Sequence, residues 1–81
     1  MKATASEDLE IGKVYDTSNK DHLRLKYLGV WFFPAEGQEV KIFKPMDRET
    51  GRYFIHVTHP TLGEVIPFPI KGSGWYEVDQ N

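Results

Sequence analysis

An alternation of apolar and charged residues over positions 22–30 constrains the fold of this chain more than any other feature. Three apolar side chains alternate there with two cations, in the order Leu23, Arg24, Leu25, Lys26 and Tyr27. Successive side chains of a β-strand point to opposite faces, so this period of two predicts a half-buried strand. The apolar run WFFP continues the strand, and Pro34 ends it because proline has no N–H to donate.

Turn residues divide the rest of the chain into further short strands, expected at 12–15, 39–44, 52–58, 64–70 and 75–78. The segments between them are rich in Gly, Pro, Asn and Asp, which favour turns. Residues 46–51 (MDRETG) are expected to form a hairpin connection that ends on Gly51. Pro67 and Pro69 remove two N–H donors from one run, which predicts an edge strand or a polyproline-like segment.

Short antiparallel strands without a crossover helix predict an all-β fold. We expect a small antiparallel barrel of five or six strands, SH3-like, with no substantial helix; an OB-like barrel is the alternative. A chain of 81 residues can bury one core. Residues 1–10 are expected to be a flexible N-terminal leader, and residues 11–79 a single barrel domain.

The net charge and the cysteine content limit which partners and which cellular compartment we expect. The formal net charge is −2, whereas nucleic-acid-binding domains usually carry a clear excess of Lys and Arg, so nucleic acid is not the favoured partner. The sequence has no cysteine, which fits a reducing compartment, and a cytoplasmic location is expected. No apolar run approaches the roughly 18 residues that a membrane span needs, so no membrane association is expected.

Motifs for catalysis or metal binding are missing from the sequence. His56 and His59 are three positions apart, which on a strand directs them to opposite faces, and His22 opens a different strand. A zinc site needs three or four converging ligands. No nucleophile elbow or phosphate-binding loop surrounds the GSG at 72–74. We therefore expect a protein that is not an enzyme, with no catalytic residue, no metal and no cofactor.

Aromatic residues exceed what one small core should hold, with two Trp, four Tyr and five Phe. Alternation assigns one set of apolar residues to the core: Leu23, Leu25, Tyr27, Val40, Ile42, Tyr53, Ile55, Val57 and Val78. A second set of rings competes with them for space: Phe33, Phe43, Phe54, Phe68 and Tyr76. Some of these rings are expected at the surface. The alternative is that WFFP and IPFP pack together as a second small core.

Exposed rings bordered by cations are typical of surfaces that recognise proteins, since rigid rings lose little entropy on binding. The expected anchors are Trp31, Phe33, Phe43, Phe54 and Trp75. The expected steering cations are Arg24, Lys26 and Arg52, with Lys41 and Lys44 beside them.

The sequence therefore predicts a small protein-interaction module, an accessory or inhibitor protein that binds a partner protein through an aromatic-rich sheet face. The alternative is single-stranded nucleic acid bound through the same face, with bases stacked on the rings. Self-association stays open, although the two prolines disfavour strand pairing at their edge.

Overall fold

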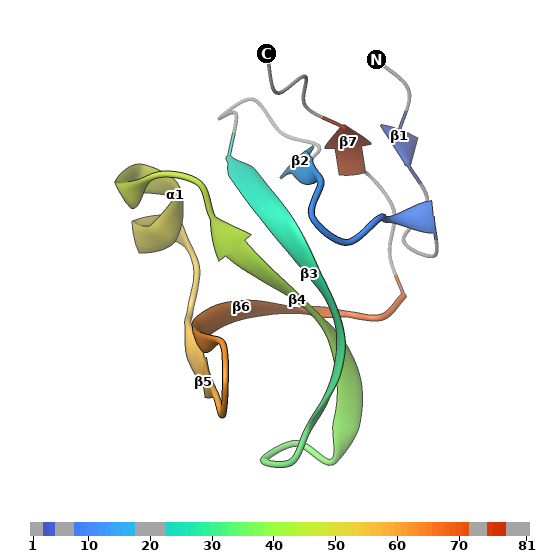
Figure 1. Cartoon of the computed structure of the whole chain (residues 1–81), viewed down its shortest axis with the longest axis vertical. Coiled ribbons are helices and arrows are strands. Elements are labelled where there is room, and N and C mark those ends of the chain that lie inside the picture. The colour runs from blue at the N-terminus through green and yellow to red at the C-terminus, as the bar shows by residue number, and fades with distance from the viewer. Residues whose placement is uncertain (1–2, 5–7, 18–22, 72–74, 78–81) are drawn as a thin grey trace.

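The computed structural model describes residues 3–4, 8–17, 23–71 and 75–77, and it contains one β-sheet and one short helix (Figure 1). The elements follow one another in the order β1 (Ala3–Thr4), β2 (Val14–Thr17), β3 (Arg24–Phe33), β4 (Gln38–Pro45), α1 (Arg48–Tyr53), β5 (Val57–His59), β6 (Gly63–Pro69) and β7 (Trp75–Glu77). Within these residues, no helix has the length and apolar character needed to cross a membrane.

The sheet has the strand order β1-β7-β2-β3-β4-β6-β5, and each recorded pair of neighbouring strands is antiparallel. The all-β, antiparallel prediction is confirmed. Among the described residues the sheet is open, because its two end strands, β1 and β5, do not pair with each other. Part of the segment expected to be a flexible leader belongs to the sheet, since Ala3 and Thr4 pair with Tyr76 and Trp75 of β7.

Strand β3 confirms the predicted alternation and then reverses it at a β-bulge. Leu25 and Tyr27 are buried while Arg24 and Lys26 are exposed. The register with β4 shifts between Tyr27 and Gly29, where Tyr27 lies opposite Phe43 and Gly29 opposite Ile42. Because directly opposed residues share a face and adjacent residues do not, odd-numbered positions change face at the bulge.

This reversal gives the sheet a core on each face. On one face the buried residues are Tyr15, Leu25, Tyr27, Phe43, Ile66 and Trp75, and we call them the first core. On the other face Val40, Ile42 and Val65 form the second core, against which Leu28, Trp31, Phe33 and Val57 pack. The chain thus has a second core, to which WFFP contributes Trp31 and Phe33. The expectation that WFFP and IPFP form it together is wrong, because Ile66 and Phe68 of IPFP belong with the first core.

The helix α1 replaces two elements that the sequence predicted. Neither the hairpin connection at 46–51 nor the strand at 52–58 forms, apart from Val57 and Thr58 in β5. Asp47 begins the helix: its backbone is extended, and its Oδ1 accepts the N–H of Thr50 at 2.8 Å. Thr50 is buried, so this turn lies against the rest of the domain.

The chain after α1 is held by His56, whose Nε2 donates to the carbonyl of Gly51 at 2.5 Å. Two side chains that the predicted strand assigned to the core are instead exposed at the surface. The exposed fraction is 61% for Tyr53 and 83% for Ile55. Of the other expected core residues, Val78 lies outside the described residues, and Leu23, Leu25, Tyr27, Val40 and Ile42 are buried as predicted.

The cap of α1 predicts a measurable pH dependence. The Thr50 N–H, with smaller help from its hydroxyl and from Arg24, lowers the pKa of Asp47 below its ordinary value of 3.8. The stabilising effect of this carboxylate is therefore complete above that value and is lost as the pH falls through the lowered pKa. In thermal unfolding, the midpoint of wild type should exceed that of Asp47→Asn at neutral pH, and the difference should shrink below about pH 4.

Glu39→Gln, which removes an exposed carboxylate from β4, is the control and should show no such convergence. A difference between wild type and Asp47→Asn that stays constant down to about pH 3 would contradict an ionised cap at Asp47.

Strand β6 lies between β4 and β5 in the strand order, and it pairs with them over different halves. Residues 63–65 pair with β5, and residues 66–69 pair with β4. Pro67 and Pro69 fall in this second half, opposite Ile42 and Val40. The predicted edge is therefore correct for the proline-containing half, whose recorded partner is β4 alone, whereas the half before it carries the end strand β5.

Candidate functional site

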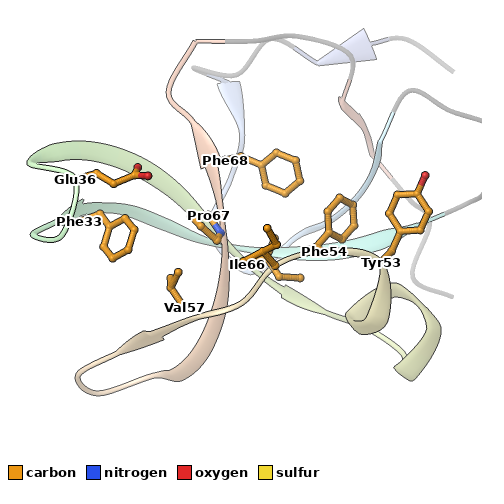
Figure 2. Close-up of a pocket in the computed structure, with 9 residues that line it drawn as sticks. Phe33, Glu36, Tyr53, Phe54, Val57, Ile66, Pro67 and Phe68 are labelled. Carbon is orange, nitrogen blue, oxygen red and sulfur yellow. The ribbon is translucent and has the colours of Figure 1, made fainter.

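An open groove of about 450 Å³ crosses the half of β6 that pairs with β4 alone. Apolar and aromatic side chains make up most of its wall, and Figure 2 draws them. Its lining is Phe33, Glu36, Tyr53, Phe54, Ile55, Val57, Ile66, Pro67 and Phe68. We call this surface the aromatic groove.

Three segments distant in sequence build the groove. The last residue of α1 and the two residues after it supply Tyr53, Phe54 and Ile55. Strand β6 supplies residues 66–68 in the middle, and the end of β3 with its turn supplies Phe33 and Glu36. In Figure 2 Tyr53 and Glu36 mark opposite ends of this row. The extended backbone of the helix cap at Phe54 directs the chain away from α1 and along β6.

The rings at the α1 end connect the groove to the first core. Tyr53 and Phe54 have ring centroids 5.3 Å apart, and Phe54 and Phe68 have the same separation, both edge to face. Phe68 then contacts Phe43 at 5.3 Å and Trp75 at 5.0 Å. Edge-to-face pairs at these distances are favourable, so Phe54 and Phe68 are held against the first core.

Two of the five expected anchors line the groove and a third lies beside it. Phe33 and Phe54 are half-buried lining residues. Trp31 is half-buried between Phe33, at a centroid distance of 5.2 Å, and His59, at 4.8 Å. The structure thus brings Trp31 and Phe33 together on the second core.

The remaining two expected anchors, Phe43 and Trp75, are interior residues. Their exposed fractions are 0% and 6%, and their rings stack at 4.5 Å with 18° between the planes. Their expected place on a surface is therefore corrected: β4 is covered on both faces, and β7 folds over the first core. They support the groove through Phe68 and are not available to a partner.

The expected steering cations lie outside the groove lining. Arg24 is exposed and pairs with Asp47, with 3.8 Å between Nη2 and Oδ2, whereas Arg52 is exposed in the last turn of α1. Lys26 lies directly opposite Lys44 on the neighbouring strand.

Lys41, expected at the surface, is 6% exposed, with its Nζ 3.5 Å from the Tyr27 hydroxyl and above that ring. The charged group in the groove is instead a carboxylate, Glu36, which accepts a hydrogen bond from Gln38 at 3.1 Å.

Sequence reasoning missed Tyr53, Ile55 and the role of Phe68. The period of two over 52–58 suggested a strand, and it concealed a helix start that was present in the sequence. Asp47 followed by charged residues and then by Thr50 is an N-cap pattern. Recognising it would have removed Tyr53 from the predicted strand. Glu36 had no signal of its own, because no local pattern shows that the β3–β4 turn borders the same groove as β6.

The polar groups of the groove are few, and His56 and His59 make their hydrogen bonds outside it. The lining has the Tyr53 hydroxyl and the Glu36 carboxylate as its side-chain polar groups. His59 Nδ1 accepts the backbone N–H groups of Thr61 and Leu62, each at 3.1 Å. Within the described residues no three His, Cys, Asp or Glu side chains gather as metal ligands; His22 lies outside them. The groove is therefore suited to covering apolar groups.

Comparison of the chain with protein-family models, with curated proteins and with solved structures finds no match. The functional argument accordingly rests on the geometry of the groove.

Proposed function

We propose that this protein is a non-enzymatic protein-interaction module, an accessory or inhibitor protein that binds a partner protein in the aromatic groove. The observation that carries the proposal is the exposure of Tyr53 and Ile55, at 61% and 83%, beside half-buried rings. Large apolar side chains that project beside a concave apolar surface mark sites where a partner covers them.

The rigidity of the groove supports the same function. Phe54 and Phe68 pack on the first core and Phe33 packs on the second, so binding requires little further ordering of these rings. Aromatic residues held in this way are the usual centres of binding energy in protein interfaces. The anchors that we retain are Phe33 and Phe54, with Trp31 beside them and Tyr53 and Ile55 added.

Single-stranded nucleic acid, the alternative ligand, has less support. A groove that tracks a phosphate backbone carries cations along its length, whereas the lining residues of this groove include no Lys or Arg and one carboxylate. Binding of nucleic acid would also weaken steeply with added salt, because each phosphate contact releases counterions.

The finer description of the fold and the compartment are also proposals. The long strands β3 and β4 contribute to both cores, and the bulge between them bends the sheet. These features support an SH3-like barrel, with an OB-like barrel as the alternative. The lack of cysteine supports a reducing, cytoplasmic location.

Paired substitutions of exposed residues test the proposed function. Tyr53→Ser and Ile55→Ser alter the groove, while Phe32→Ser and Ile11→Ser change side chains of similar exposure, 55% and 73%, outside its lining. Each tagged variant is used for affinity capture from the native cell extract after nuclease treatment, with quantitative mass spectrometry. A stoichiometric protein captured by wild type should fall about tenfold or more with the groove variants, as expected for loss of an interface anchor. The controls should retain it.

All four variants should unfold within about 0.5 kcal/mol of wild type, since they change exposed groups. If Phe32→Ser no longer captures the partner while Tyr53→Ser still does, the interface lies on the other face of β3. That result would contradict the proposal. If nuclease treatment removes the proteins that wild type captures, single-stranded nucleic acid would be favoured as the ligand.

A further inference from the structure

The half of β6 that pairs with β4 alone limits what the aromatic groove can bind. Residues 66–69 all lie opposite residues of β4, and alternate residues of a strand direct their backbone polar groups to opposite edges. Because proline has no N–H to donate to a ladder, we assign Ile66 and Phe68 to the edge that bonds to β4, and Pro67 and Pro69 to the open edge. A strand added at this edge would find carbonyl groups but no donors there.

An occupant that does not need ladder hydrogen bonds is therefore favoured over an added strand. A polyproline-type segment meets this condition, because its backbone makes no internal hydrogen bonds and its ring faces pack on aromatic side chains. The groove offers such rings at both ends, Phe33 at one and Tyr53 with Phe54 at the other, with Pro67 and Ile66 between them (Figure 2).

The charge of the groove sets a second condition on the occupant and defines which way along the groove it lies. Glu36 is the one charged residue among the nine that line it, and it lies at the end away from Tyr53 (Figure 2). Its Oε1 is held by Gln38 at 3.1 Å, which fixes the carboxylate beside the apolar surface. A cation on the occupant complements this carboxylate, whereas an acidic residue at the same point is repelled.

We propose that the groove binds an extended, proline-containing segment of a partner protein, with a Lys or Arg of that segment paired to Glu36. This inference rests on the proposed function and specifies its partner. The prolines of the segment lie over the rings, and its basic residue lies at the β3–β4 turn.

A random peptide library of about twelve residues, displayed and selected on the immobilised protein, tests the inference even while the partner is unidentified. Wild type should enrich peptides that contain both proline and a basic residue. Glu36→Arg should exchange the preference for a basic residue for an acidic one while keeping the prolines. Glu39→Arg, which makes the same charge change at an exposed β4 position outside the groove lining, should select as wild type does.

The peptide most enriched on wild type then gives the size of the effect. Glu36→Gln should weaken its binding about two- to fivefold, the usual value for an exposed ion pair, and the loss should diminish in high salt. Ile55→Ser should also weaken binding of this peptide, and because Ile55 is uncharged this loss should not depend on salt.

Three results would overturn the inference. Peptides enriched on wild type could lack proline, Glu36→Arg could leave the charge preference unchanged, or wild type could enrich nothing above background. None of these three results tests the proposed function. That function is tested separately, by the effect of Tyr53→Ser and Ile55→Ser on capture of the native partner. If those variants lose the native partner but the selected peptides show no charge preference, the groove is still the partner-binding site. Glu36 is then not part of the recognition.

Discussion

Replacing Phe43 by alanine is expected to lower the free energy of unfolding by about 3–5 kcal/mol, the usual cost of removing a buried ring. Its side chain is fully buried, stacks on Trp75 at 4.5 Å, and contacts Tyr27 at 5.2 Å and Phe68 at 5.3 Å. No single neighbour can fill the space that these contacts leave. Since a domain of this size rarely has more than about 3–5 kcal/mol of net stability, much of the variant should be unfolded at 25 °C.

Urea unfolding followed by far-UV circular dichroism measures this loss. The matched control is Phe32→Ala, because Phe32 is on an adjacent strand and 55% exposed, and its replacement should change stability by no more than about 0.5 kcal/mol. A Phe43→Ala protein as stable as wild type would mean that the ring is not in the core. That result would return Phe43 to the surface anchors.

Replacing Gly29 by alanine is expected to cost about 1–3 kcal/mol, because its φ of +121° is a backbone conformation that residues with a Cβ rarely adopt. The added methyl group would also lie 3.3 Å from Ile11 Cδ1, a contact that the exposed Ile11 side chain can relieve by moving. The conformational strain is therefore the larger part of the loss. If the bulge relaxes, the register between β3 and β4 changes, and with it the position of Trp31 and Phe33 over the second core.

Gly51→Ala is the matched control, since it adds the same methyl group within α1 at a position without positive φ, 3.4 Å from Pro45 Cγ. Alanine there should be neutral or should stabilise by up to about 1 kcal/mol through its higher helix propensity. Thermal unfolding of both variants, with an amide NMR spectrum of Gly29→Ala, measures stability and register together. Equal stability of Gly29→Ala and wild type would show that the bulge does not need this backbone conformation.

The two predictions concern the same property of the sheet, its burial on both faces. In β4, residues 40–43 are all buried, so alternation in this strand does not separate core from surface. A pattern that assumes one buried face must leave half of these side chains outside. For that reason Phe43 was expected at the surface, although Val40 and Ile42 were placed correctly.

The sequence by itself determined the all-β class, the boundaries of most strands and the buried face of β3 up to Tyr27. These follow from local rules, because alternation, turn residues and proline act over a few neighbouring positions. The same rules identified Pro67 and Pro69 as marking an edge, and in the structure these residues pair with β4 alone. Phe33 and Phe54 were found because the chain has more rings than one small core should hold.

Tertiary structure alone decided the rest of the candidate site. The bulge at Gly29 turns Trp31 and Phe33 onto a second core. Helix α1 and the residues after it leave Tyr53 and Ile55 exposed, where a strand would have placed both in the core. Glu36 lines the groove from the turn between β3 and β4, a segment far from β6 in the chain. Each of these positions depends on which elements pack on the two faces of the sheet. That packing brings together residues that are far apart in the chain, so a local sequence pattern cannot predict it.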